Sequence, residues 1–198
     1  MTAHQAALEA LTRYFGYDSF RPGQQGIVEA LLAGRDVLGV MPTGAGKSVC
    51  YQIPAALSPG MTLVISPLIS LMRDQVDALN DLGLPAAFIN TTQTPDEQAM
   101  VFAQAAAGQI KLLYVAPERL ETGRFRDFAA RTPISLIAVD EAHCVSQWGQ
   151  DFRSSYLGIG DFIAGLPQRP GAPGHRGTAG IAESGRHRYR IRPAEPVF

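Results

Sequence analysis

Short apolar runs alternate with amphipathic segments over most of the chain. The runs are four or five residues long, and the segments between them carry apolar residues at helical spacing, which predicts strands that alternate with helices. The predicted strands are 37–41, 62–66, 86–89, 111–115 and 136–139. The predicted helices are 3–15, one that begins at Pro22 and ends at Gly34, one that follows Lys47, 68–82, 95–107 and 156–166.

Strands that alternate with helices favour an α/β fold with a doubly wound, mostly parallel sheet flanked by helices, which binds its ligands at the carboxyl ends of the strands. A length of 198 residues suits one domain. The apolar content of 46% is typical of a soluble globular protein, and no apolar run approaches the roughly 18 residues of a membrane span. The first residues show no secretory signal and the two cysteines no metal or redox spacing, so we expect a cytoplasmic protein without a membrane partner.

The stretch 36–48 reads D-V-L-G-V-M-P-T-G-A-G-K-S, a predicted strand that meets a glycine-rich turn before a helix. Gly44 and Gly46 lack Cβ atoms and so let backbone N–H groups surround a polyphosphate. The start of the next helix favours an anion, Lys47 adds a charge for the outer phosphates, and the Ser48 hydroxyl suits Mg²⁺. Methionine stands at the first glycine of the full phosphate-loop pattern, so a tight turn with a surface lysine is the alternative.

Asp140 and Glu141 directly follow the apolar run 136–139. Acids at the carboxyl end of a parallel strand lie where such sheets bind ligands. Asp140 is suited to hold Mg²⁺, and Glu141 to orient and deprotonate an attacking water. Acids that only begin a solvated helix are commoner, but together with Lys47 and Ser48 this pair favours a nucleoside triphosphate site.

Two further groups of residues are candidates for binding. Tyr17 and Gln24 precede the phosphate loop, and a ring with an amide can sandwich and hydrogen-bond a purine base. On composition alone, however, core packing of the tyrosine is favoured. Trp148 and Phe152 beside Arg153 would make a stacking platform for single-stranded bases, whereas a lone tryptophan is more often in the core.

Charge is unevenly distributed along the chain, although the net charge is only −1. Residues 1–168 contain 11 basic and 16 acidic side chains, while residues 169–198 contain six arginines and two glutamates. The body is therefore not a generally basic nucleic-acid-binding protein, and any DNA contact within it must be local.

Five stretches resemble the RecQ family of ATP-dependent DNA helicases, in that family's order and spacing, over about residues 8–170. They are F-R-P-G-Q at 20–24, M-P-T-G-A-G-K-S at 41–48, V-I-S-P-L-I-S-L-M-R-D-Q-V at 64–76, Y-V-A-P-E-R-L at 114–120 and D-E-A-H-C-V-S-Q-W-G at 140–149. The resemblance implies the first, RecA-like motor lobe of a superfamily 2 helicase. Such a helicase couples ATP hydrolysis to 3′-to-5′ unwinding in DNA recombination and repair.

The resemblance also implies roles for particular residues. Those implied to bind ATP and its Mg²⁺ are Tyr17, Arg21, Gln24, Thr43, Gly44, Ala45, Gly46, Lys47, Ser48 and Asp140. Lys47, Asp140 and Glu141 would be catalytic, with Ser48 and Asp140 at the metal. Those implied to bind single-stranded or duplex DNA, or to couple it to hydrolysis, are His143, Gln147, Trp148, Phe152 and Arg153. Many members have glycine in place of Ala45, and a negative φ would allow the alanine.

The resemblance ends near Pro170. Residues 169–198 are rich in Gly, Pro and Arg and show no periodic apolar face, so we expect a divergent, disordered basic tail after a domain at 1–168. The family places a buried strand and a Thr-Ala-Thr turn there; we expect neither, which would leave the sheet incomplete at its C-terminal end. We hypothesise a frameshifted or truncated gene product without the second helicase lobe, the source of an arginine finger.

The sequence thus favours a fragment of an ATP-dependent DNA helicase that binds ATP but does not unwind DNA alone. The alternative is a stand-alone module that binds ATP or single-stranded DNA without motor activity. A third class, a small kinase, needs a phosphate-acceptor site and a lid, and the Trp148 loop after D-E-A-H argues against it. DNA-stimulated ATP turnover distinguishes the first two.

Overall fold

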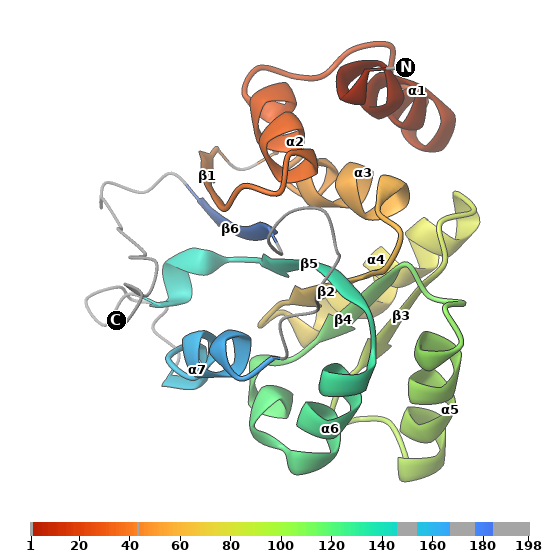
Figure 1. Ribbon diagram of the computed structural model, residues 1–198, viewed down its shortest axis with the longest axis vertical. Coiled ribbons are helices and arrows are strands. Elements are labelled where there is room, and N and C mark those ends of the chain that lie inside the picture. The colour runs from red at the N-terminus through yellow and green to blue at the C-terminus, as the bar shows by residue number, and fades with distance from the viewer. Residues whose placement is uncertain (1, 43, 146–153, 167–176, 184–198) are drawn as a thin grey trace.

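A computed structural model describes residues 2–42, 44–145, 154–166 and 177–183, with the backbone alone for 143, 145 and 177–183. The described strands form one parallel sheet in the order β1-β6-β5-β2-β4-β3 (Figure 1). The strands are β1 Val37–Met41, β2 Met61–Ile65, β3 Ala86–Ile89, β4 Leu112–Val115, β5 Ile134–Val139 and β6 Gly177–Glu183. The helices are α1 Ala3–Phe15, α2 Gln24–Leu32, α3 Val49–Leu57, α4 Ile69–Asp81, α5 Pro95–Ala106, α6 Gly123–Arg131 and α7 Ile159–Ala164, with single 3₁₀ turns η1 Pro117–Glu121, η2 Ala142–Val145 and η3 Ser154–Tyr156.

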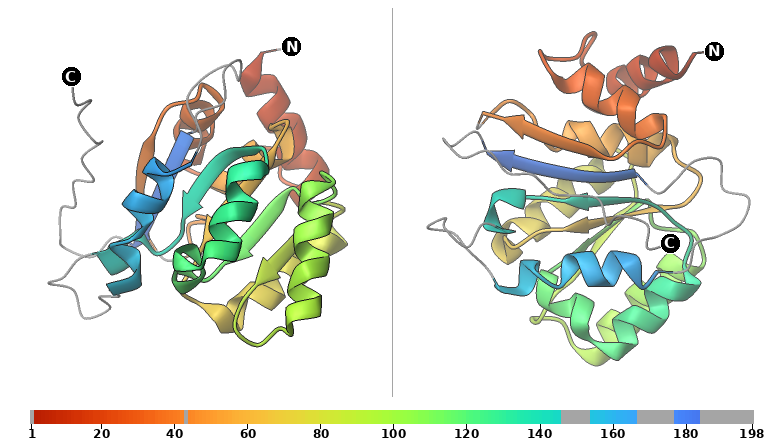
Figure 2. Two further views of the ribbon diagram at one scale, coloured as in Figure 1. Left: turned by 60° about the horizontal axis from the view of Figure 1, so that its bottom comes forward. Right: turned by 60° about the vertical axis from the view of Figure 1, so that its left-hand side comes forward.

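Helices cover both faces of the sheet (Figure 2). Successive residues of a strand point to opposite faces. Leu63 and Ile65 of β2 therefore pack in one core with α5, α6 and α7, whereas Val64 packs in a second core with α3 and α4. Helices α1 and α2 add a third cluster against α3. The phosphate-loop helix α3 is thus packed on both sides, which fixes its position over the sheet.

The ends of several helices follow from local sequence. Helix α5 begins with a capping box, in which the Thr94 hydroxyl accepts from the Glu97 backbone N–H and the Glu97 carboxylate accepts from the Thr94 backbone N–H. Helix α1 begins at the cap Thr2 and ends at Gly16, whose φ of 69° is the left-handed conformation of a helix C-terminus.

The predicted α/β fold with a parallel sheet between helices is confirmed. The bounds of α1, β1 and β3 coincide with the predicted ranges 3–15, 37–41 and 86–89. Helix α6 was not predicted, because its sequence G-R-F-R-D-F-A-A-R places few apolar residues among charged ones. Its buried residues are only Phe125 and Ala129.

The prediction that the sheet lacks its last strand is wrong for residues 177–183. These residues form β6, which pairs with β1 on one side and β5 on the other. A strand between two parallel neighbours is held by backbone hydrogen bonds and needs no alternating apolar pattern, so the search for a periodic face missed it. Residues 169–176 and 184–198 lie outside the described residues, and the domain boundary at 168 stays a prediction.

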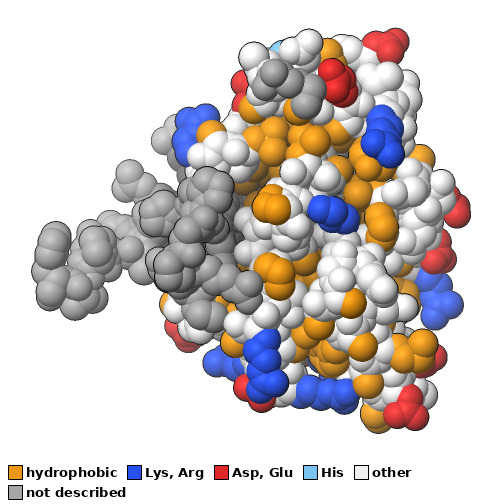
Figure 3. Space-filling model, turned by 45° about the vertical axis from the view of Figure 1, so that its right-hand side comes forward, with side chains coloured by type: hydrophobic (Ala, Val, Ile, Leu, Met, Phe, Trp, Pro, Cys, Tyr) orange, Lys and Arg blue, Asp and Glu red, His pale blue; other side chains and the backbone are white. Residues whose placement is uncertain are grey.

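The surface carries both signs of charge. On the face shown in Figure 3, basic and acidic side chains are scattered around patches of apolar ones and do not gather into one basic area. Within the described ranges, no helix is both long and apolar enough to cross a bilayer.

Candidate nucleotide-binding site

The phosphate loop lies at the carboxyl end of β1 and leads into α3, with Ser48 as the residue before the helix. Gly44 and Gly46 have φ angles of 78° and 75°, which L side chains rarely adopt. A Cβ at Gly46 would also lie 2.7 Å from the side-chain nitrogen of Gln24. Ala45 has no such strain, because Glu141 is the one non-glycine residue with positive φ in the described part of the chain.

Side chains that precede and begin α2 hold the loop from outside. The Arg21 guanidinium donates to the Gly44 carbonyl at 2.9 Å, and the Gln24 amide donates to the carbonyls of Ala45 and Gly46 at 3.1 and 3.0 Å. The Gln24 amide oxygen accepts from the Arg21 backbone N–H at 2.9 Å. Gln24 is only 3% exposed, so both ends of a buried amide serve to fix the loop.

The acid pair follows β5, in the middle part of the sheet. The Asp140 backbone N–H donates to the Ile65 carbonyl of β2 at 2.8 Å, and one Asp140 carboxylate oxygen accepts from the Glu141 N–H at 3.0 Å. Asp140 is 7% exposed. Glu141 has a φ of 49°, a conformation that costs a non-glycine residue about 1–3 kcal/mol and persists only where its surroundings hold it.

The two halves of the site meet at an ion pair. The Lys47 ammonium lies 3.7 Å from a carboxylate oxygen of Glu141, and these side chains are 13% and 16% exposed. Charges that are largely shielded from water interact more strongly than surface charges. The phosphate loop and the acid pair therefore belong to one site.

A buried polar cluster lies beneath this site. The hydroxyls of Tyr51 and Tyr114 are 3.5 Å apart, and the Gln52 amide donates to Tyr114 at 3.3 Å. Burial, followed by the charges of Tyr114 and Asp140, raises the pKa of Tyr51 well above its ordinary value, while a hydrogen bond with the Ser48 side chain opposes the shift. Tyr51 thus stays neutral and lies near both Ser48 and Asp140.

The burial of these polar side chains is the feature that marks them as a cluster. Burial also raises the pKa of Tyr114. Tyrosine and glutamine inside a sheet-facing helix or strand must find polar partners. No role was predicted for Tyr51, Gln52 and Tyr114, because neither the predicted helix after Lys47 nor the motif Y-V-A-P-E-R-L at 114–120 shows that their polar groups meet in the fold.

The chemistry of the candidate metal ligands fits a hard cation. The Ser48 hydroxyl and the Asp140 carboxylate offer oxygen ligands, which Mg²⁺ prefers, and phosphates supply others in nucleotide sites. The described residues contain no group of three or more His, Cys, Asp and Glu that could hold a metal. Burial raises the pKa of the Cys50 thiol to about 12.

Comparison with known protein families assigns the chain to one of them. The profile of the DEAD/DEAH box helicase family matches residues 21–171. The chain belongs to the DEAD/DEAH box helicase family. This assignment covers the phosphate loop, the acid pair and the segment between them.

Relatives and solved structures agree with the family. The ATP-dependent DNA helicase RecQ of Haemophilus influenzae is 51% identical over 164 residues, which are 83% of this chain and 26% of that protein. RecQ of Bacillus subtilis is 47% identical over 165 residues, 83% of this chain and 28% of that protein. The chain thus spans about a quarter of the length of these relatives.

Two solved helicase structures share the fold at low sequence identity. A hypothetical ATP-dependent RNA helicase from Sulfolobus tokodaii superposes with a TM-score of 0.66 at 18% identity, over 90% of this chain and 50% of that one. The helicase MrfA, in a complex with DNA and AMPPNP, superposes with a TM-score of 0.70 at 16% identity, over 92% of this chain and 27% of that one. They confirm the predicted α/β fold of a RecA-like lobe.

The structure of this DEAD/DEAH box chain brings many of the predicted residues together. The predicted site residues joined by the contacts above are Arg21, Gln24, Gly44, Ala45, Gly46, Lys47, Ser48, Asp140 and Glu141. Tyr17 is 49% exposed, with its ring centre 5.9 Å from the Arg21 guanidinium carbon. Only the backbone of His143 is described. The predicted residues outside the described ranges are Thr43, Gln147, Trp148, Phe152 and Arg153.

Proposed function

We propose that this chain is the ATP-binding lobe of a RecQ-type DNA helicase, which couples ATP hydrolysis to single-stranded DNA binding and 3′-to-5′ unwinding. The observation that carries the proposal is the 3.7 Å approach of the Lys47 ammonium to the Glu141 carboxylate, which unites the phosphate loop and the acid pair. The relatives described above, which are named ATP-dependent DNA helicases, support the choice of nucleotide and nucleic acid.

The ion pair has a role in the proposed reaction. Lys47 would bind the outer phosphates of ATP, while the N–H groups of the glycine loop and the start of α3 surround them. Once a phosphate takes the place of Glu141 beside Lys47, the carboxylate is released. Glu141 would then orient the attacking water and accept its proton.

The remaining site residues bind and orient the nucleotide. Ser48 and Asp140 would hold Mg²⁺, which when bound neutralises charge on the β- and γ-phosphates. Tyr17, Arg21 and Gln24 would hold adenine. Because both ends of the Gln24 amide hold the phosphate loop and its neighbour Arg21, Gln24 would exchange these hydrogen bonds for bonds to the base when adenine binds.

DNA binding is assigned to the segment after the acid pair. We assign contact with single-stranded DNA, and its coupling to hydrolysis, to the set His143, Gln147, Trp148, Phe152 and Arg153. A tryptophan and a phenylalanine near an arginine suit stacking on bases of any sequence. We place the complete helicase in DNA recombination and repair in the cytoplasm.

The chain alone is proposed to bind ATP without unwinding DNA. It corresponds to about a quarter of the RecQ relatives, and an arginine finger from elsewhere in such a motor contributes about 10³–10⁵ in rate. A stand-alone ATP- or DNA-binding module without motor activity is the second candidate function.

ATP hydrolysis by the purified chain, with and without single-stranded DNA, tests the proposal beside Lys47→Ala and Trp148→Ala. We expect ATP binding that is lost in Lys47→Ala, with little turnover. DNA-stimulated turnover that disappears in both variants would instead show a complete coupled ATPase. An ATP affinity that is the same in Lys47→Ala as in the wild type would contradict the proposed site.

A further inference from the structure

The peptide group between Asp140 and Glu141 is hydrogen-bonded at both ends. Its N–H, on Glu141, donates to the Asp140 carboxylate at 3.0 Å. Its carbonyl, on Asp140, accepts from the hydroxyl of Tyr156 at 2.9 Å. The orientation of this one peptide sets the directions in which both acidic side chains leave the backbone.

That orientation is not one that the backbone adopts by default. Glu141 has a φ of 49°, in the left-handed region that glycine favours. The Glu141 carbonyl then accepts from the Cys144 N–H at 2.9 Å, which begins the turn η2. A bond that fixes the preceding carbonyl therefore stabilises an otherwise unfavourable arrangement of the acid pair.

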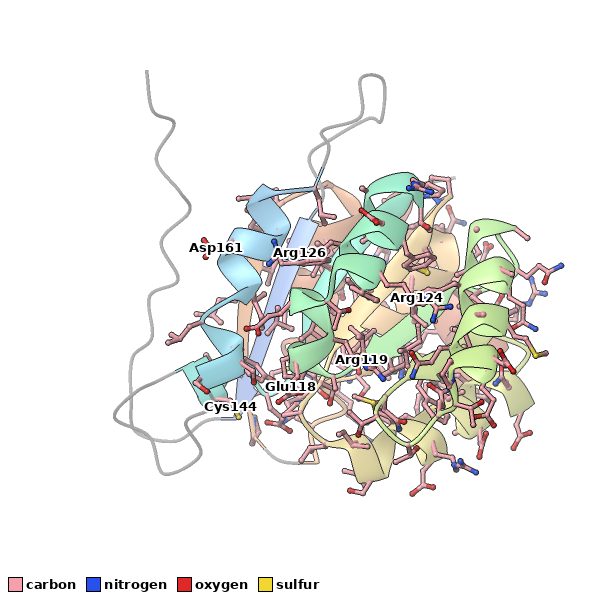
Figure 4. The ribbon with its side chains drawn as sticks, turned by 90° about the horizontal axis from the view of Figure 1, so that it is seen from below. Glu118, Arg119, Arg124, Arg126, Cys144 and Asp161 are labelled. Carbon is pink, nitrogen blue, oxygen red and sulfur yellow. The ribbon has the colours of Figure 1, made fainter. Side chains whose placement is uncertain are left out.

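The tyrosine that makes this bond is itself firmly held. Tyr156 is 2% exposed and packs in the apolar core shared by α6 and α7. The neighbouring Ser155 hydroxyl donates to the Glu118 carboxylate at 3.1 Å. Glu118, after β4, and Cys144, after β5, lie at the same edge of the sheet (Figure 4). Packing around the ring and the Ser155 hydrogen bond thus hold the Tyr156 hydroxyl beside the Asp140 carbonyl.

The chain returns to the acid pair at Tyr156, 16 residues after Asp140. A phenylalanine ring would fill the same core volume, so the apolar packing alone does not require the hydroxyl. We propose that the Tyr156 hydroxyl is a positioning group that orients the Asp140–Glu141 peptide, and with it the carboxylates for Mg²⁺ and water. This inference rests on the proposed function of the site.

The test compares Tyr156→Phe with the wild-type chain in binding a fluorescent ATP analogue, at increasing Mg²⁺ and in EDTA. Partners that orient a metal ligand typically contribute 10–100-fold to metal affinity. We expect the apparent Mg²⁺ affinity of Tyr156→Phe to fall about ten-fold. Binding in EDTA, which depends on the phosphate loop, should not change.

Thr132→Val is the matched control. The buried Thr132 hydroxyl donates to the Phe128 carbonyl at 2.9 Å, so this variant also removes one hydroxyl-to-carbonyl bond, at the end of α6. We expect it to bind the analogue and Mg²⁺ like the wild type. An equal loss of Mg²⁺ response in Thr132→Val would show general softening of the fold and overturn the inference.

Two other results would also overturn it. Tyr156→Phe with a wild-type Mg²⁺ response, in a chain whose binding depends on Lys47, would refute the positioning role and leave the proposed function intact. Equal weakening with Mg²⁺ and in EDTA would assign the hydroxyl to folding alone. A wild-type chain with no binding dependent on Lys47 and Mg²⁺ would refute the proposed function itself.

A second variant, Ser155→Ala, tests the inference if Tyr156→Phe does not fold. Ser155→Ala removes the bond that ties η3 to Glu118 while it keeps the Tyr156 hydroxyl. Loosening of η3 should reduce the apparent Mg²⁺ affinity in the same direction and by less, with binding in EDTA unchanged. A wild-type Mg²⁺ response in Ser155→Ala would then contradict the inference.

Discussion

Strand β1, which leads into the phosphate loop, lies at the edge of the described sheet, whereas β5, which leads into the acid pair, has a strand on each side. Val40 of β1 is 57% exposed, while Ile137 and Ala138 of β5 are fully buried. One half of the candidate nucleotide site is therefore carried by the surface of the fold and the other by its core.

The hydrogen bonds of the two halves differ in the same way. The phosphate loop is held by the side chains of Arg21 and Gln24, which reach its carbonyls from outside the sheet. The acid pair is held by the backbone of β2 through Ile65 and by the core residue Tyr156. The loop is thus fixed by side chains of a neighbouring segment, and the acid pair by sheet backbone and a core side chain.

Among the changes that test this difference between β1 and β5, removal of residues 169–198 should have the largest effect on folding. The strand β6 separates β1 from β5, and β1 pairs with no other described strand. Without β6 the edge strand and its loop lose their backbone partner, and an unpaired β5 edge is exposed to aggregation. We expect the shortened chain to lose cooperative thermal unfolding, as measured by circular dichroism. We also expect its monomer peak in gel filtration to disappear.

A chain that ends at Glu183 is the control for this truncation. It retains all of β6, and we expect it to unfold cooperatively like the full chain. If the shorter chain, cut after residue 168, folded and bound ATP as well as the control does, the sheet would not depend on β6.

Ile137→Ala and Val40→Ala compare the two strands directly. Ile137 is fully buried, and truncation of such a side chain costs about 2–5 kcal/mol through lost transfer energy and the cavity left behind. Val40→Ala, on the exposed side of β1, should change stability by about 0.5 kcal/mol or less. Urea denaturation measures both free energies of unfolding, and equal losses would refute the contrast between edge and core.

Gln24→Ala should have a smaller effect, centred on the loop. The variant leaves the half-buried carbonyls of Ala45 and Gly46 without their side-chain donor, and loss of a typical hydrogen bond costs about 1 kcal/mol. We expect a modest loss of stability in urea together with weaker ATP binding. Gln25→Ala, on the same helix but exposed and bonded to Glu29, should change neither.

The local motifs of the site could be predicted from sequence, because Lys47 and Glu141 stand beside strands whose short apolar runs are easily recognised. The contacts that position them could not be predicted. Tyr156 reaches Asp140 through a fold in which distant segments meet, and no motif marks it. Strand β6, at 177–183, pairs through its backbone with two strands that lie far from it in the sequence, and its own sequence shows no periodic apolar face.

Calorimetric titration of ATP into the wild-type chain, Lys47→Ala and Asp140→Asn, with Mg²⁺ and in EDTA, tests most directly whether the two halves form one site. We expect Lys47→Ala to weaken binding in both conditions. We expect Asp140→Asn to weaken only the binding that depends on Mg²⁺, because the carboxylate acts through the metal. ATP binding that is the same in all three chains would contradict the account.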